Sequence, residues 1–111
     1  MVVDMMAFDV GELEPERDAD GHAYVDLLAS DRLSVGYAVW RVGGVDRQQP
    51  HAEDEVYHVV SGRAMLRVAE QERRVGPGSV VFVAAGVEHR FHQIDEELRV
   101  LVFWSPPHRR V

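Results

Sequence analysis

Two stretches of the chain decide its fold. The first, residues 43–62, reads GGVDRQQPHAEDEVYHVVSG, and the second, residues 78–93, reads GSVVFVAAGVEHRFHQ. Each combines glycine-containing turns with a short run rich in valine and aromatic residues, which favours a β-strand. Each also carries a histidine close to a carboxylate, and imidazole and carboxylate are good ligands for divalent metals. The same two segments are therefore expected to build both the fold and the site.

Further short strands are predicted around these segments. Residues 33–42 are rich in strand-forming side chains, and residues 63–68 alternate between polar and apolar, the period of a strand with one buried face. Turns are predicted at residues 61–62 and 95–97, and residues 27–29 offer at most one helical turn. Many short strands, with turn signals roughly every 8–12 residues, are typical of an all-β sandwich or barrel.

The length and the charge limit the range of functions. A chain of 111 residues is the size of one domain, so we expect a single domain over residues 1–111 with an acidic arm at about residues 1–20. The formal net charge of -7 opposes binding to nucleic acid or to anionic lipid, and Arg109 and Arg110 are too few to form a basic patch.

The cysteine count and the N-terminus bear on chemistry and location. The chain has no cysteine, which excludes disulfides, thiolate metal ligands and a cysteine nucleophile. The N-terminus lacks the early positive charge and the unbroken apolar run of a signal peptide, and no segment approaches the ~20 apolar residues that span a bilayer. The cytoplasm is the expected location, with no membrane association.

The candidate metal ligands follow from strand alternation. If the strand around residues 48–55 is unbroken, Gln49, His51, Glu53 and Glu55 share one face. His89 stands immediately before a second apolar strand. Two histidines and one carboxylate on the inner face of a barrel would leave coordination positions free for water or substrate.

The spacing of these residues resembles the cupin superfamily. Its first motif, G-x5-H-x-H-x3-E-x6-G, matches Gly43, Gln49, His51, Glu55 and Gly62, with glutamine in place of the first histidine. Its second motif, G-x5-P-x-G-x2-H-x3-N, matches Gly78, Ala84, Gly86, His89 and Gln93.

The resemblance implies a small single-domain cupin whose fold is a double-stranded β-helix, or jelly-roll barrel. It also implies one divalent metal ion, with zinc, iron, manganese and nickel left open, bound by His51, Glu55 and His89. Gln49 is expected in or near the ligand shell, because it occupies the position of the missing histidine.

Other side chains are assigned by parity and by their distance from the motifs. Tyr57, Phe91 and Gln93 share parity with the ligands and are expected either to line the same cavity or to pack in the core. Glu53 is interpreted as a solvated carboxylate, His58 and His92 as outer-face residues, and His22 and His108 as surface residues.

These features predict a function and an assembly in general terms. The first hypothesis is a metal-dependent enzyme for a small organic substrate, similar to a cupin dioxygenase or isomerase. The alternative is a non-catalytic module that binds or senses a small molecule. A homodimer is expected as well, because residues 98–104 are apolar on both faces and only one face can fill the barrel.

Overall fold

The computed structural model describes residues 4–108, and the expected all-β fold is confirmed. Arg109, Arg110 and the first three residues of the acidic arm lie outside the described part of the chain. No helix in the described residues is long and apolar enough to cross a membrane. The elements are the 3-10 turn η1 (Val10–Glu12) and the strands β1 (Ala23–Ala29), β2 (Ser34–Trp40), β3 (Asp54–Val68), β4 (Gln71–Val75), β5 (Val80–Val83) and β6 (His89–Ser105).

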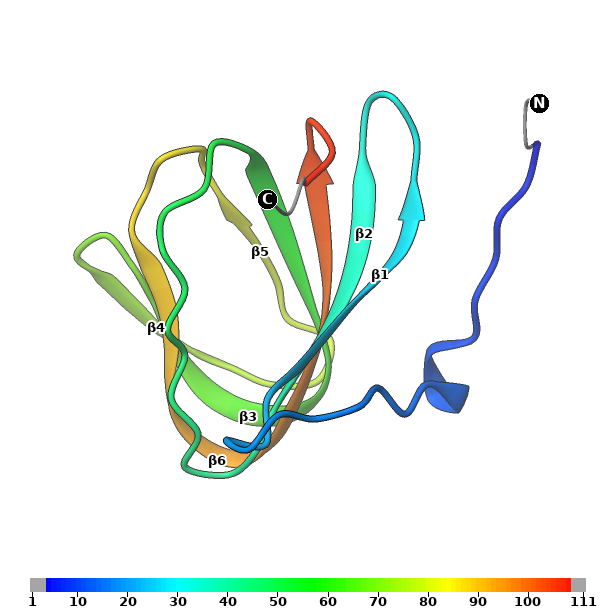
Figure 1. The fold of residues 1–111 in the computed structure, drawn as a ribbon. Coiled ribbons are helices and arrows are strands. Elements are labelled where there is room, and N and C mark those ends of the chain that lie inside the picture. Colours follow the sequence, from blue (N-terminus) through cyan, green and yellow to red (C-terminus); the bar gives the residue numbers. More distant parts are fainter. Residues whose placement is uncertain (1–3, 109–111) are drawn as a thin grey trace.

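The strands form one antiparallel sheet that curls into a barrel (Figure 1). The order across the sheet is β1-β2-β6-β3-β4, and β5 pairs with the first part of β3. The two longest strands, β3 and β6, bend along their length and contribute to both walls, which gives the jelly-roll form. This curl decides which residues of the two motifs can meet.

Two predicted turns are instead bulges within long strands. The sequence predicted that chain reversals at residues 61–62 and 95–97 would end strands, but β3 and β6 continue through both positions. The ladder between them shifts register from Val59 to Met65, and Gly62 takes a φ of +94° within the shifted stretch. Glycine and acidic residues fit a bulge as well as a turn, and pairing with a long partner strand favours the bulge.

Residues 27–29 form no helical turn. They end β1, where Leu28 pairs with Val35 of β2. A neighbouring strand offers these residues a ladder of hydrogen bonds, and this outweighs their local helical propensity.

The acidic arm before β1 is extended apart from η1 and lies outside the barrel (Figure 1). Its residues Val10 and Leu13 pack against an outer cluster that includes Tyr37 and Val39 of β2. An ion pair between Arg17 and Glu97 also ties the arm to β6. The arm therefore covers part of the outer face of the sheet.

The barrel interior is apolar over most of its length. Leu66, Val75, Phe91 and Leu98 are among its fully or almost fully buried residues. Within the described residues, the buried polar and charged side chains are few: Ser34, Asp46, Glu55 and His89. A carboxylate and an imidazole are seldom buried without a specific role, so Glu55 and His89 direct attention to the site.

Candidate metal centre and its pocket

Three residues of the two motifs meet inside the barrel. His51, Glu55 and His89, here called the inner donor group, have ligand atoms that all lie within 4.8 Å of one another. Nε2 of His89 is 2.7 Å from Oε1 of Glu55, and both side chains are only 1% exposed. This group could hold a metal ion.

Local hydrogen bonds join the segments that carry the group. The N–H of Gly86 donates to the carbonyl oxygen of His51 at 2.7 Å, and the N–H of Ala85 donates to Oδ1 of Asp54 at 2.8 Å. These bonds place the turn before β6 against the start of β3. His51 and His89 are thereby brought together, with ring centroids 5.3 Å apart.

The polar atoms of the group suit a metal ion. Nδ1 of His89 donates to the carbonyl oxygen of Val87 at 2.8 Å, which leaves the lone pair of a neutral imidazole on Nε2. That nitrogen and both carboxylate oxygens of Glu55 are buried, and the 2.7 Å contact between Nε2 of His89 and Oε1 of Glu55 is their main polar contact among the described residues. A divalent ion would satisfy all three atoms at once, because it accepts electron pairs from both imidazole and carboxylate.

The protonation of the two histidines is shifted in opposite directions. Burial lowers the pKa of His51, so this ring tends to be neutral and able to ligate. Burial also acts to lower the pKa of His89, but Glu55 and the Val87 carbonyl outweigh it, and the pKa is raised overall. Because the raised pKa of His89 favours its protonated form, a metal ion at this site would have to displace a proton from that ring.

Gln49 does not join this group. Its side chain is exposed, whereas the neighbouring Gln48 is half-buried and places Oε1 3.3 Å from Nε2 of His51. The prediction for Gln49 assumed an unbroken strand. Residues 44–53 are irregular and β3 begins only at Asp54, so alternation does not apply there.

Gln48 belongs to a buried network that the sequence did not reveal. Its Nε2 donates to Oδ2 of Asp46 at 2.8 Å, and its Oε1 accepts from the hydroxyl of Tyr57 at 3.2 Å. Asp46 also accepts from the N–H of Phe91 at 2.9 Å, and burial raises the pKa of this aspartate. The network fixes the amide so that its oxygen faces His51. The only sign of this network in the sequence was the pair Gln48-Gln49, since either glutamine could have faced His51.

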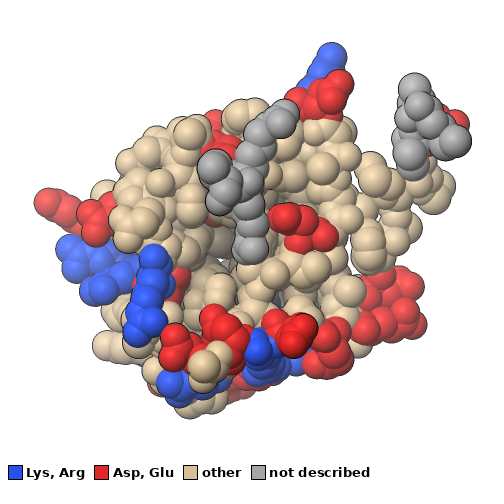
Figure 2. Space-filling view, in the orientation of Figure 1, with Lys and Arg blue, Asp and Glu red and all other residues tan. Residues whose placement is uncertain are grey.

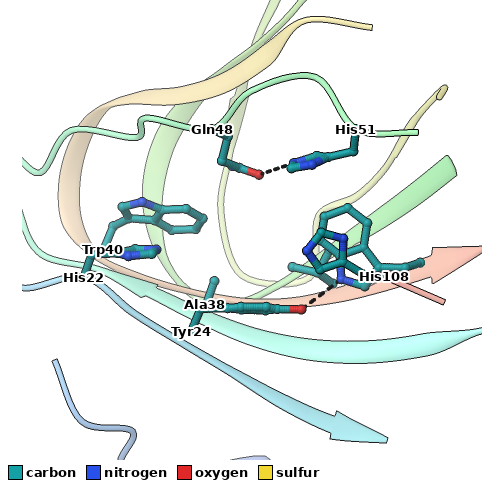
Figure 3. Close-up of a pocket in the computed structure, with 9 residues that line it drawn as sticks. His22, Tyr24, Ala38, Trp40, Gln48, His51 and His108 are labelled. Atoms are coloured by element: carbon teal, nitrogen blue, oxygen red, sulfur yellow. Dashed lines mark hydrogen bonds between the residues drawn. The ribbon is translucent and has the colours of Figure 1, made fainter. Parts of the chain in front are cut away.

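A pocket of about 130 Å³ opens beside His51 (Figure 3). In Figure 3 Gln48 and His51 approach it from the segment before β3, and Trp40 and Tyr24 face them from β2 and β1. No lysine or arginine lines it within the described residues. The lining residues are His22, Tyr24, Ala38, Trp40, Gln48, His51, Val102, Trp104 and His108.

Two histidines interpreted as surface residues belong to this pocket. His22 lies against Trp40, with ring centroids 5.2 Å apart, and His108 stacks on Trp104 at 4.1 Å. Glu53, interpreted as solvated, lies 3.2 Å from Nδ1 of His108 and is only 12% exposed. Local sequence gives no indication that His108 contacts Glu53, because this contact joins the segment after β6 to the residue before β3.

The remaining parity predictions have mixed outcomes. Tyr57 and Phe91 are buried in the apolar core, but Gln93 is exposed because a φ of +47° in the bulge of β6 turns it outward. His58 lies on the outer face, in register with Val80 and Leu101, and His92 pairs with Glu72 at 2.8 Å. The bulges therefore interrupt strict alternation in β6.

Comparisons with known proteins by sequence and by structure point to the same family. A family model described as the cupin domain matches residues 36–105. An uncharacterized protein of Streptomyces coelicolor is 52% identical over 103 residues, which cover 93% of this chain and 98% of that protein. The dimethylsulfoniopropionate lyase DddQ of Ruegeria pomeroyi is 33% identical over 79 residues, covering 69% of this chain but only 39% of the lyase. An RmlC-like cupin from Shewanella frigidimarina has the same fold, with a TM-score of 0.76 at 19% identity over 94% of this chain and 92% of that one.

Proposed function

The chain belongs to the cupin family, and from this premise we propose that it is a metal-dependent enzyme acting on a small organic substrate. One observation carries the proposal: the inner donor group gathers buried imidazole and carboxylate ligand atoms within 4.8 Å of one another, and His51 joins it to an aromatic pocket. A buried group of this kind is costly without an ion to complete it. A pocket beside it gives a substrate access to that ion.

In this proposal His51, Glu55 and His89 hold one divalent ion. Zinc, iron, manganese and nickel all accept this combination of ligands. The ion would supply Lewis-acid or redox chemistry, and three protein ligands would leave positions for substrate and water. The chain's own contribution is to orient the ligands. The Val87 carbonyl accepts from the ring of His89, and the amide of Gln48, itself hydrogen-bonded to Tyr57, lies beside the ring of His51.

The pocket favours a small substrate without a strong negative charge. Its volume of about 130 Å³ favours a small molecule, and its walls are largely aromatic. No described lining residue is a lysine or arginine that could pair with a carboxylate or phosphate. On the face shown in Figure 2, charged side chains gather mainly at the lower edge and the sides. The relative named as a lyase of dimethylsulfoniopropionate also supports an enzyme for a small organic compound.

The first test measures turnover and its dependence on metal. Metal-loaded protein is incubated with small phenols, diketones and sugars while product and dissolved oxygen are followed. We expect at least one compound to be converted, and a chelator to abolish the reaction until metal is restored. If a compound binds equally well with and without metal and none is converted, the enzyme is excluded in favour of the non-catalytic binding or sensing module.

We further propose that the chain forms a homodimer in the cytoplasm. Phe82, Val56 and Phe103 lie side by side on β5, β3 and β6, and form an apolar row on the outer face. Phe82 is 60% exposed and Phe103 is 40% exposed. Leu101 packs against the same outer cluster as Val10 and Leu13 of the acidic arm, whereas Phe82 and Phe103 stay exposed. A second copy would cover the row, because a two-fold axis brings the same apolar surface from each chain together.

Light scattering at micromolar concentration should give the mass of two chains. Replacing Phe103 by Glu would place two charges in the buried interface and should yield a monomer. The matched control is Val42→Glu, which changes another exposed apolar residue away from the row and should leave the dimer intact. A monomeric wild-type protein, or equal masses for all three proteins, would refute the dimer.

A further inference from the structure

His51 belongs to a second group of potential ligands. With Glu53 and His108 it forms what we call the outer donor group, whose ligand atoms also lie within 4.8 Å of one another. Two histidines and a carboxylate are the same combination of ligands as in the inner donor group. The family motifs include neither Glu53 nor His108, so this group arises from the particular sequence and fold of this chain.

The outer donor group is held in place by contacts that need no ion. His108 stacks on Trp104 with ring centroids 4.1 Å apart and planes inclined by 16°, and its backbone N–H donates to Oγ of Ser34 at 2.8 Å. Its Nδ1 lies 3.2 Å from Oε2 of Glu53. The ring of His51 meets the ring of His108 edge-on at 5.5 Å. Little ordering would therefore be needed for these side chains to bind an ion.

The two groups differ in their access to solvent. The side chains of His108 and Glu53 are 17% and 12% exposed, against 1% for His89 and Glu55. His108 and His51 line the aromatic pocket, whereas Glu55 and His89 are not among its lining residues. An ion that arrives through the pocket would meet the outer donor group first.

We propose that His51, Glu53 and His108 form a second binding position for a divalent cation. Because the two donor groups compete for His51, the chain binds one ion tightly, and the outer position fills when the inner one is disabled. The competition with the inner donor group rests on the proposed function, but the outer position itself does not.

Binding of Co2+ to the full chain tests the proposal, because its visible absorption reports imidazole and carboxylate ligation without any turnover. The inner donor group is disabled by His89→Ala and, with less change of shape, by Glu55→Gln. We expect each variant still to bind one ion, roughly 100-fold more weakly than wild type. Adding His108→Ala or Glu53→Gln to either variant should remove saturable binding at concentrations that fill the single variant. Adding His58→Ala, which changes an outer-face histidine, should have no effect.

The outcomes separate this proposal from the inner site. If His89→Ala and Glu55→Gln bind no ion although wild type does, or if adding His108→Ala leaves their affinity unchanged, the outer position is overturned. If these two variants bind as tightly as wild type and His108→Ala alone abolishes binding, the outer position stands and the inner site falls. If no protein binds Co2+, both are overturned. Thermal unfolding of each variant confirms that it is folded when binding is measured.

Discussion

A large excess of divalent ion should raise the midpoint of thermal unfolding of the wild-type protein by more than about 10 °C. An ion that binds only the folded chain stabilises it by roughly 4 kcal/mol when its concentration is about a thousand times its dissociation constant. In a domain of this size, each kcal/mol moves the midpoint by several degrees. The physical source is the buried carboxylate of Glu55 and the Nε2 atom of His89, which lie 2.7 Å apart and could both bind the ion.

The replacement His51→Ala should abolish almost all of this shift. His51 is common to both donor groups, so its loss disables the inner and the outer position together. It is only partly buried and lies in an irregular segment, so the metal-free variant should unfold close to the metal-free wild type. His58→Ala should behave as wild type, since His58 lies on the outer face. Differential scanning calorimetry with Zn2+, Mn2+, Ni2+ and Fe2+ in turn measures the effect, and the metal site is refuted if no ion moves the wild-type midpoint.

Gly62→Ala should destabilise the protein by roughly 3 kcal/mol or more, whether or not metal is present. A Cβ at Gly62 would lie 2.2 Å from the backbone oxygen of Glu97 and 2.7 Å from Cα of Leu98. Neither backbone atom can move without separating β3 from β6. The residue also has a φ of +94°, which L-residues adopt only with strain.

Gly43→Ala is the matched control for this effect. Gly43 has a φ of +70°, but a Cβ there would meet nothing within 4 Å. The variant should therefore be destabilised only by the positive φ, which costs about 1 kcal/mol for a residue with a Cβ. Urea unfolding of the two variants in parallel isolates the steric part. Equal losses at the two positions would mean that β3 and β6 are less closely packed at the bulge than the structure shows.

The sequence alone determined the fold class and the family. The spacing between the glycines, the histidines and Glu55 matched both motifs. The barrel and the match to the cupin family model agree with this prediction. Such spacing is informative because a turn glycine and an inward-facing ligand must stand at set distances along a strand. For the same reason it selected His51, Glu55 and His89, which the structure brings together.

Side-chain direction outside regular strands could not be read from the sequence. Alternation predicted Gln49 as the inward residue, but Gln48 faces His51 because residues 44–53 form no strand. Alternation also failed at Gln93, where a bulge turns the side chain outward. A two-residue period holds only while the ladder is regular, and the positions of the bulges depend on how β3 pairs with β6.

Only the tertiary structure decided which distant residues complete the site. Along the ladder between β3 and β6, Glu55 pairs with Trp104 and His89 pairs with Val68 at the far end of β3. The curl of the sheet nevertheless brings Glu55 and His89 to 2.7 Å. The segment after β6 likewise folds back so that His108 reaches His51 and Glu53. Local sequence specifies strands and turns through short-range sterics, whereas these contacts depend on the twist and closure of the whole sheet.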